Sequence, residues 1–283
     1  MIDGMVVVDA HVHAPRLATV KRAWMEWAVR FGAGHDWRSA YGPDGAVDPA
    51  ALDALFEEQG VDVALLFCEY SPRATGIQPI EDNLPIAAHN PHRFRLVANL
   101  NTHLHHPLVA ELERQLDLGA VALKLHPVHA GFSPGDAELY PVYALCRERG
   151  IPVIVHCGTS TFPDSRTAYA DPALLLNAIE DHPEVNFILA HGGRGWWYAA
   201  AAFLARSRDN VWIDLSGLPP HRLPAYYDDF QRLAPRCLFG TDWPGVPGTA
   251  ANARALAALP LAPDTLRAVL AGNAAKLFPN LGI

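Results

Sequence analysis

The residues of this chain best suited to chemistry are two histidines near its start, His11 and His13. They follow an apolar run, residues 5–10, that has the composition of a β-strand. Side chains alternate between the two faces of a strand, so residues two apart point the same way. We therefore expect two imidazoles side by side at the end of one strand. Neutral imidazole is a common ligand of zinc and similar divalent ions.

Three further polar side chains end apolar runs in the same way. His156 follows Val-Ile-Val, His191 follows Phe-Ile-Leu-Ala, and Asp242 follows Leu-Phe-Gly-Thr. A lone histidine after an apolar run is more often a structural residue. Several histidines and a carboxylate at equivalent strand ends instead predict a shared metal site.

The elements that would position these residues alternate along the chain. Short runs rich in Val, Ile, Leu and Phe predict strands at residues 5–10, 61–68, 94–100, 120–125, 152–156, 186–191, 211–215 and 237–240. Helix-like segments lie between them, among them residues 107–118, 137–149, 171–181 and 223–233. Strands without polar alternation are typical of a sheet buried on both faces. We therefore predict an α/β fold, the parallel (β/α)8 barrel known as the TIM barrel.

An open, doubly wound sheet would show the same alternation of strands and helices. No G-x-G-x-x-G motif follows any strand, however, and the polar candidates come from the first, middle and last strands. Only a closed ring brings all of those strand ends together. We expect residues 263–277 to form an additional closing helix.

We predict a single domain over residues 1–283, because neither a repeat nor a linker is evident. One insertion, residues 14–48, separates the first strand from a helix that begins near Pro49. It contains the aromatic residues Trp24, Trp27, Phe31, Trp37 and Tyr41. Loops after barrel strands lie over the active site, so the insertion is either a lid or substrate wall, or aromatic packing on the barrel rim.

Composition excludes several classes of protein. Half of the 283 residues are hydrophobic, which suits a large core, and the net charge of −8 argues against a nucleic-acid partner. No apolar run reaches the length of about 18 residues that a membrane span needs. The first residues lack the features of a signal peptide, so we expect a cytoplasmic protein.

The four cysteines form no C-x-x-C pair, and we expect them to be buried thiols. A nucleophilic Cys157 is the alternative, although strand alternation points it away from His156.

Several motifs resemble the amidohydrolase superfamily, and more narrowly its amidohydrolase-related (amidohydrolase 2) metal-dependent barrel branch. The motifs are Asp9-Ala10-His11-Val12-His13, Val155-His156, Leu189-Ala190-His191-Gly192-Gly193 and Phe239-Gly240-Thr241-Asp242-Trp243-Pro244. The resemblance continues to Gly272-Asn273-Ala274-Ala275-Lys276-Leu277-Phe278, which is similar to the branch's Asn-Ala-x-x-Leu-Phe tail. These motifs specify the branch and not the substrate.

The resemblance implies a role for each of these positions. It implies that His11, His13, His156 and Asp242 bind one divalent metal, and that His191 acts beside the metal-bound water as a general acid or base or as an electrostatic clamp. Such a metal lowers the pKa of bound water from about 16 to about 7. Asp242 would accept that proton and later return it to a leaving group. Zinc suits nitrogen and carboxylate ligands best, and manganese or iron would also fit.

Three further residues have the correct position for substrate or a second metal. Lys124 and His126 lie on one face of the fourth strand, and Arg194 follows the sixth. In relatives with two metals a carboxylated lysine bridges the ions, whereas the branch resembled here usually holds one metal. We therefore favour Lys124 as a substrate anchor or structural partner over a metal bridge. His126 lines the pocket or is structural, and Arg194 binds a carboxylate or is an ordinary surface residue.

The resemblance and the residues together leave three hypotheses for function. The first is a metal-dependent hydrolase, in which metal-activated water attacks a carbonyl of a small organic substrate that bears a carboxylate. The second is a metal-dependent, non-oxidative decarboxylase of an aromatic or unsaturated acid. The third is a barrel that binds a ligand without turnover. A homo-oligomer that buries the Trp196-Trp197-Tyr198 segment is also compatible with the sequence.

Overall fold

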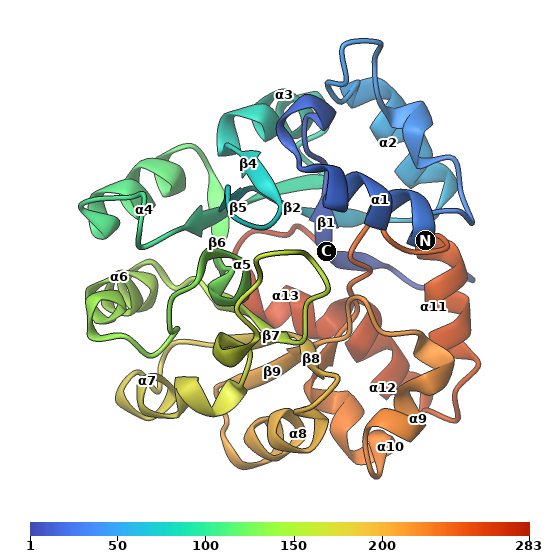
Figure 1. Ribbon diagram of the computed structural model, residues 1–283. Helices are drawn as coiled ribbons and strands as arrows, with labels where there is room; N and C mark the ends of the chain where they lie inside the picture. The colour runs from blue at the N-terminus through green and yellow to red at the C-terminus, as the bar shows by residue number, and fades with distance from the viewer.

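Eight parallel strands form a ring in the computed structural model, which describes residues 1–283, and helices surround the ring (Figure 1). In their order around the ring the strands are β1 (Val8–His13), β2 (Val63–Phe67), β5 (Phe94–Leu100), β6 (Ala120–Leu125), β7 (Val153–Gly158), β8 (Phe187–Arg194), β9 (Val211–Asp214) and β10 (Cys237–Leu238). The fold is the predicted (β/α)8 barrel, and each of the eight predicted strands is present.

The ring closes through backbone hydrogen bonds between β1 and the segment that follows β10. Ala10 N donates to Phe239 O at 3.1 Å, and His13 N donates to Trp243 O at 2.9 Å. In the opposite direction, Asp242 N donates to His11 O at 2.9 Å. The first and last predicted ligands are therefore brought together by the closure itself.

Most of the helices cover the outside of the ring. They are α1 (Arg22–Phe31), α2 (Pro49–Glu58), α3 (Leu84–His89), α4 (Leu108–Asp117), α5 (Pro127–Ala130), α6 (Tyr140–Arg149), α7 (Leu176–Asp181), α8 (Tyr198–Ser207), α9 (Leu223–Tyr226), α10 (Phe230–Leu233), α11 (Thr249–Ala257), α12 (Pro263–Arg267) and α13 (Asn273–Leu277). A short π-helical stretch joins α12 to α13, so the predicted closing helix is nearly continuous. Residues of α13 pack with the side chains inside the barrel and cover one end of it.

One local prediction was wrong. Residues 223–233 form two short helices, since Tyr227 is extended and Asp229 has a φ of 53°. The buried Tyr227 hydroxyl donates to Gly192 O at 2.8 Å, a tertiary contact that interrupts the helical run. A small antiparallel hairpin after β2, formed by β3 (Glu69–Ser71) and β4 (Gly76–Gln78), was not predicted.

Alternation along β7 determines which side chains face the barrel interior. Ile154 belongs to the interior cluster, whereas Val155 and Cys157 pack in the outer cluster between strands and helices. The Cys157 thiol thus points away from His156, and burial raises its pKa to about 12. All four cysteines are buried and free, as expected.

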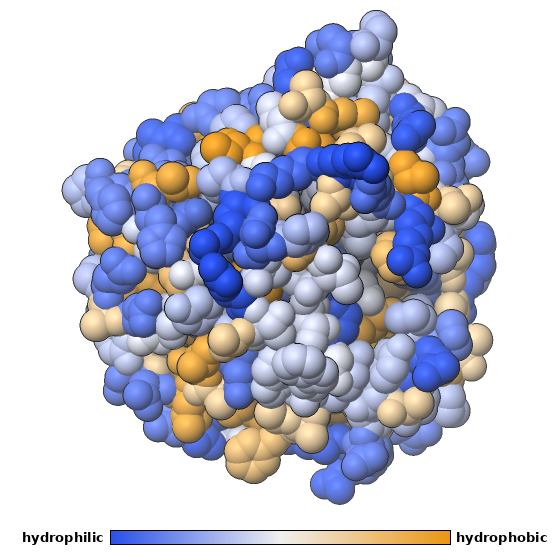
Figure 2. All heavy atoms as spheres, viewed as in Figure 1, coloured by the Kyte–Doolittle hydropathy of each residue, from blue (hydrophilic) through white to orange (hydrophobic).

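None of the helices is both long and apolar enough to cross a bilayer. On the face viewed in Figure 2, hydrophobic residues form separate groups among hydrophilic ones.

Candidate active site

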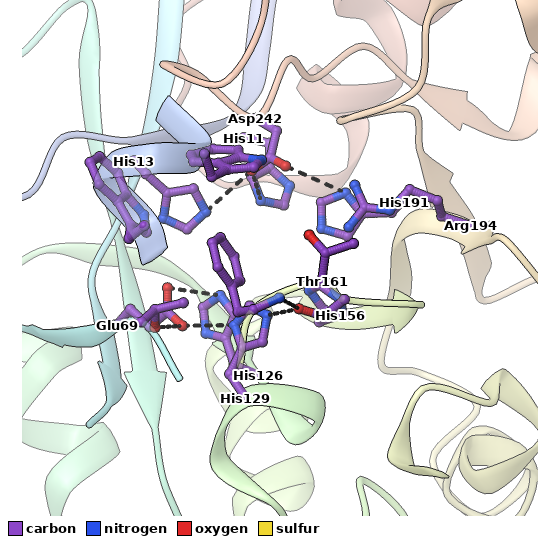
Figure 3. A pocket seen from close by; sticks show the side chains of 15 residues that line it. His11, His13, Glu69, His126, His129, His156, Thr161, His191, Arg194 and Asp242 are labelled. Atoms are coloured by element: carbon purple, nitrogen blue, oxygen red, sulfur yellow. Dashed lines mark hydrogen bonds and ion pairs between the residues drawn. The ribbon is translucent and has the colours of Figure 1, made fainter. Parts of the chain in front are cut away.

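The predicted site residues meet at the C-terminal ends of the barrel strands. Seven of them line one cavity: His11, His13, His126, His156, His191, Arg194 and Asp242. Figure 3 shows them converging from different elements. Lys124 is the exception and does not line the cavity.

The hydrogen bonds of His11 fix which of its ring nitrogens faces the cavity. Its Nδ1 lies 2.6 Å from Oδ2 of Asp214, a carboxylate that can only accept, so Nδ1 carries the proton. Ser216 Oγ donates to the same carboxylate oxygen at 2.8 Å and holds it in place. The lone pair therefore remains on Nε2, which is buried, has no hydrogen-bond partner and lies 3.5 Å from Oδ1 of Asp242.

His191 is oriented in the same way by a backbone acceptor. Its Nδ1 donates to the Ser216 carbonyl oxygen at 2.9 Å, which leaves the Nε2 lone pair free. The backbone of His191 has a φ of 63°, and that of Asp242 has a φ of 74°. Left-handed backbone is uncommon for residues other than glycine, and here it occurs at the two residues predicted to handle protons.

His11, His191 and Asp242 offer ligand atoms that all lie within 4.8 Å of one another. Nε2 of His13 is also 3.5 Å from Oδ1 of Asp242. His156 is adjacent, with its ring centroid 4.6 Å from that of His191 and its Nε2 buried without a partner. Imidazole lone pairs and a carboxylate directed at one region repel each other unless a cation lies between them. The donor set therefore fits a divalent metal ion.

The protonation states agree with this fit. Burial lowers the pKa of His11, His156 and His191 well below the usual range, and neighbouring positive groups act in the same direction. Neutral imidazole is the form that binds metals. Burial raises the pKa of Asp214, whereas the charge of Lys124 and the hydrogen bonds from Ser216 favour the ionised form that accepts from Nδ1 of His11.

A second group of potential ligands adjoins the first and consists of His13, Glu69 and His126. Asn99 determines the tautomer of His126. The Asn99 side-chain oxygen accepts from Tyr70 N at 2.9 Å, and its amide nitrogen donates both to Lys124 O and to His126 Nδ1. Since Nδ1 accepts this hydrogen bond, neutral His126 carries its proton on Nε2, which is therefore a donor. This tautomer favours a substrate-binding role for His126 over a metal-binding one.

Lys124 lies inside the barrel on β6, fully buried, with its Nζ 4.8 Å from the centroid of the Phe67 ring. The ammonium has no hydrogen-bond partner. Burial lowers its pKa to about 8, against the attraction of Asp214 and Asp242. The predicted roles of Lys124, as a substrate anchor or a carboxylated bridge, remain predictions.

The predicted insertion contributes to the cavity and to the core. Trp24 and Trp27 of α1 line the cavity, and Trp24 and Trp37 are buried in a cluster with Val12 and Trp243. Both interpretations of residues 14–48 thus have contacts in their favour.

Comparisons with known proteins place this site in a family. The sequence profile of the family described as "Amidohydrolase" matches residues 8–279, which include every predicted ligand. The chain belongs to the amidohydrolase family. No curated protein matched this amidohydrolase.

Solved structures of similar fold carry several names. An uncharacterized TIM-barrel protein from Bordetella bronchiseptica is 23% identical, with a TM-score of 0.78, and the match covers 96% of this chain and 98% of that one. The 5-carboxyvanillate decarboxylase of Sphingomonas paucimobilis is 15% identical, with a TM-score of 0.65, and the match covers 97% of this chain and 99% of that one. A third structure is that of a probable 2-pyrone-4,6-dicarboxylic acid hydrolase from Acinetobacter baumannii with citric acid bound. It is 15% identical, with a TM-score of 0.67, and the match covers 99% of this chain and 100% of that one. These likenesses show the fold of the amidohydrolase and not its reaction.

Two carboxylates of the amidohydrolase site were missed by sequence reasoning as functional residues. Asp214 interrupts the apolar run of β9, and a charged residue inside an otherwise apolar strand is the signal that could have identified it. Glu69 directly follows the second predicted strand, residues 61–68, but no motif around it assigns it a role. Its contacts with His126 and His129 follow only from the fold.

Proposed function

We propose that this amidohydrolase is a metal-dependent hydrolase that adds water to a carbonyl group of a small organic substrate bearing a carboxylate. The observation that supports this most directly is the convergence of His11, His191 and Asp242 within 4.8 Å, with the free ring nitrogens directed inward. We assign metal binding to His11, His13, His156 and Asp242, and the zinc, manganese or iron ion remains to be identified.

When bound, the ion would supply Lewis acidity, which activates water and polarises a carbonyl oxygen. The residues of the chain do the rest. Asp214 holds His11 in the metal-binding tautomer. Asp242 is buried beside three histidines, and we assign to it the removal of a proton from the attacking water and its return to the leaving group. His191, through its free Nε2, is positioned to act on the same proton or on the developing oxyanion.

The cavity supplies donors for a substrate carboxylate. Arg194 lines it, and one guanidinium nitrogen is fixed by a 3.1 Å bond to the Thr159 carbonyl, which orients the rest of the group. His126 offers its Nε2–H. The citric acid bound to the structural relative named a probable dicarboxylic acid hydrolase is consistent with a polycarboxylate substrate.

Metal content and hydrolysis together test the proposal. We expect His11→Ala and Asp242→Ala to lose at least half of the bound metal and nearly all hydrolysis of a panel of carboxylated lactones, esters and amides. The exposed His221→Ala is the matched control and should retain both. Full metal content in both site variants, measured by atomic emission, would contradict the metal centre.

A decarboxylase is the second candidate, and the walls of the cavity favour it. Trp24, Trp27 and Phe162 line the same cavity as Arg194, a combination that suits a flat anionic acid. The structural relatives include the named decarboxylase. Release of CO2 from an aromatic acid, without consumption of water, would favour this reaction over hydrolysis. Metal binding with no turnover of either panel would favour the non-catalytic alternative.

A further inference from the structure

One hydrogen-bonded chain in the cavity is not used by the metal centre. It runs from Glu69 through His129 to Ser160, and Figure 3 shows Glu69 and His129 across the cavity from His11 and Asp242. We propose that Ser160, His129 and Glu69 form a nucleophilic triad, a second and metal-independent acyl-transfer site that accepts small aryl esters.

The proton positions in this chain are those that a serine nucleophile requires. Nδ1 of His129 lies 2.9 Å from Oε1 of Glu69, and because the carboxylate accepts, Nδ1 carries the proton. The lone pair is then on Nε2, 3.2 Å from Ser160 Oγ. The imidazole thus accepts from the serine hydroxyl, and the carboxylate holds the ring in that tautomer.

Glu69 is built to remain an ionised orienting group. It is buried, and Oε1 also accepts from Thr75 Oγ1 at 2.6 Å. Burial opposes ionisation of this carboxyl, whereas the hydrogen bonds that it accepts from His129 and Thr75 stabilise the ionised form.

Ser160 is accessible from the cavity, and two hydrogen-bond donors near its Oγ can stabilise a negative charge on that oxygen. It is partly exposed, lines the cavity and lies in the loop that follows β7. Its Oγ accepts from Phe162 N at 3.3 Å and from Ser165 Oγ at 3.1 Å. Two donors at one oxygen stabilise the alkoxide that forms when the hydroxyl proton moves to His129.

A second serine in the same barrel provides an internal comparison. Ser216 also lies near a histidine and a carboxylate, but its Oγ and the carboxylate of Asp214 share the same ring nitrogen of His11. Its hydroxyl donates to Asp214 and is fully buried. Ser216 therefore has no free base and no access to substrate, whereas Ser160 has both.

The surroundings of Ser160 indicate the class of substrate. The Phe162 ring lies 5.4 Å from His129 and 5.8 Å from Trp27, measured between centroids. In the proposed step the Ser160 Oγ bonds to the acyl carbon while its proton passes to His129 Nε2. The bond to the aryl oxygen then breaks, the aryloxide takes the proton from His129, and water releases the acyl group by the reverse sequence.

An organophosphorus probe tests the triad directly. Diisopropyl fluorophosphate should phosphorylate Ser160, with loss of fluoride, both in the purified protein and after treatment with a chelator. Peptide mass spectrometry locates the adduct. Release of p-nitrophenol from p-nitrophenyl acetate should show an initial burst of about one equivalent per chain.

Variants distinguish the triad from general surface reactivity. We expect Ser160→Ala to abolish the adduct and the burst, and His129→Gln to slow phosphorylation by at least about 100-fold. The exposed Ser207→Ala is the matched control and should react as the wild type does. His11→Ala should also retain the adduct, so failure of the metal-dependent activity and failure of the triad are separable. The proposal would be overturned if the wild-type protein formed no adduct at Ser160. It would also be overturned if His129→Gln were labelled as fast as the wild type.

Discussion

At the scale of single residues, the neighbour of each histidine decides its chemistry. His11 and His126 are both buried at strand ends and face the same cavity. A carboxylate acceptor on Nδ1 makes His11 a lone-pair ligand, and an amide donor on Nδ1 makes His126 an N–H donor. Sequence spacing identified both residues, but it carries no information about which group is hydrogen-bonded to Nδ1 of each ring.

Asp214→Asn tests this control of the tautomer. An amide nitrogen at this position donates to Nδ1 of His11 and moves the proton to Nε2, where it blocks metal binding. We expect metal affinity to fall by about 10- to 100-fold, measured by competition with a chelating dye. Ser216→Ala retains the Asp214 acceptor and is the control; if both variants weaken affinity equally, the tautomer is not the cause.

At the scale of elements, β1 is the strand on which the site depends. Its register with β2 shifts between Asp9 and Val12, so Ala10 packs inside the barrel and His11 also reaches the cavity. The buried Asp9 carboxylate joins β1 to the segment after β10. It accepts from Thr241 N at 2.9 Å, from Thr241 Oγ1 at 2.6 Å and from His11 N at 3.2 Å.

Asp9→Ala should therefore weaken the closure of the barrel. The substitution leaves buried backbone donors of Thr241 and His11 without acceptors, and each such loss costs about 1–3 kcal/mol. We expect the free energy of unfolding to fall by about 3 kcal/mol, measured by urea denaturation at neutral pH. The exposed Asp264→Ala should cause little change; a similar loss in both variants would contradict a specific role for Asp9.

At the scale of the whole molecule, the buried imidazoles couple stability to pH. Five histidines around the cavity, His11, His13, His126, His156 and His191, have a pKa lowered by burial below the usual 6.5. The unfolded chain therefore binds more protons than the folded one once the pH falls below 6.5. Asp9, whose pKa burial raises to about 6, and Asp214 act in the opposite direction but are fewer.

We expect the free energy of unfolding to decrease as the pH falls from 7.5 to 5.5, with each buried histidine contributing at most about 1.4 kcal/mol per pH unit. Urea denaturation at several pH values measures the slope. His156→Gln should reduce the slope, and the exposed His221→Ala should leave it unchanged. A slope of zero or of opposite sign would show that the imidazoles do not dominate.

Self-association is also decided at this scale. The Trp196 side chain is 74% exposed, and Phe203 in α8 is also exposed. The predicted homo-oligomer through this segment remains a prediction.

The sequence by itself determined the barrel, because strands buried on both faces must be apolar throughout and polar residues at their ends are conspicuous. It also determined that His11, His156, His191 and Asp242 share one end of the ring. The structure alone decided what no local pattern encodes: the left-handed backbone at His191 and Asp242, the interruption of residues 223–233 by Tyr227, and the partners Asp214, Asn99 and Glu69. Those features depend on hydrogen bonds between residues far apart in the chain. Spacing along a strand cannot specify them, since they form only when the ring closes.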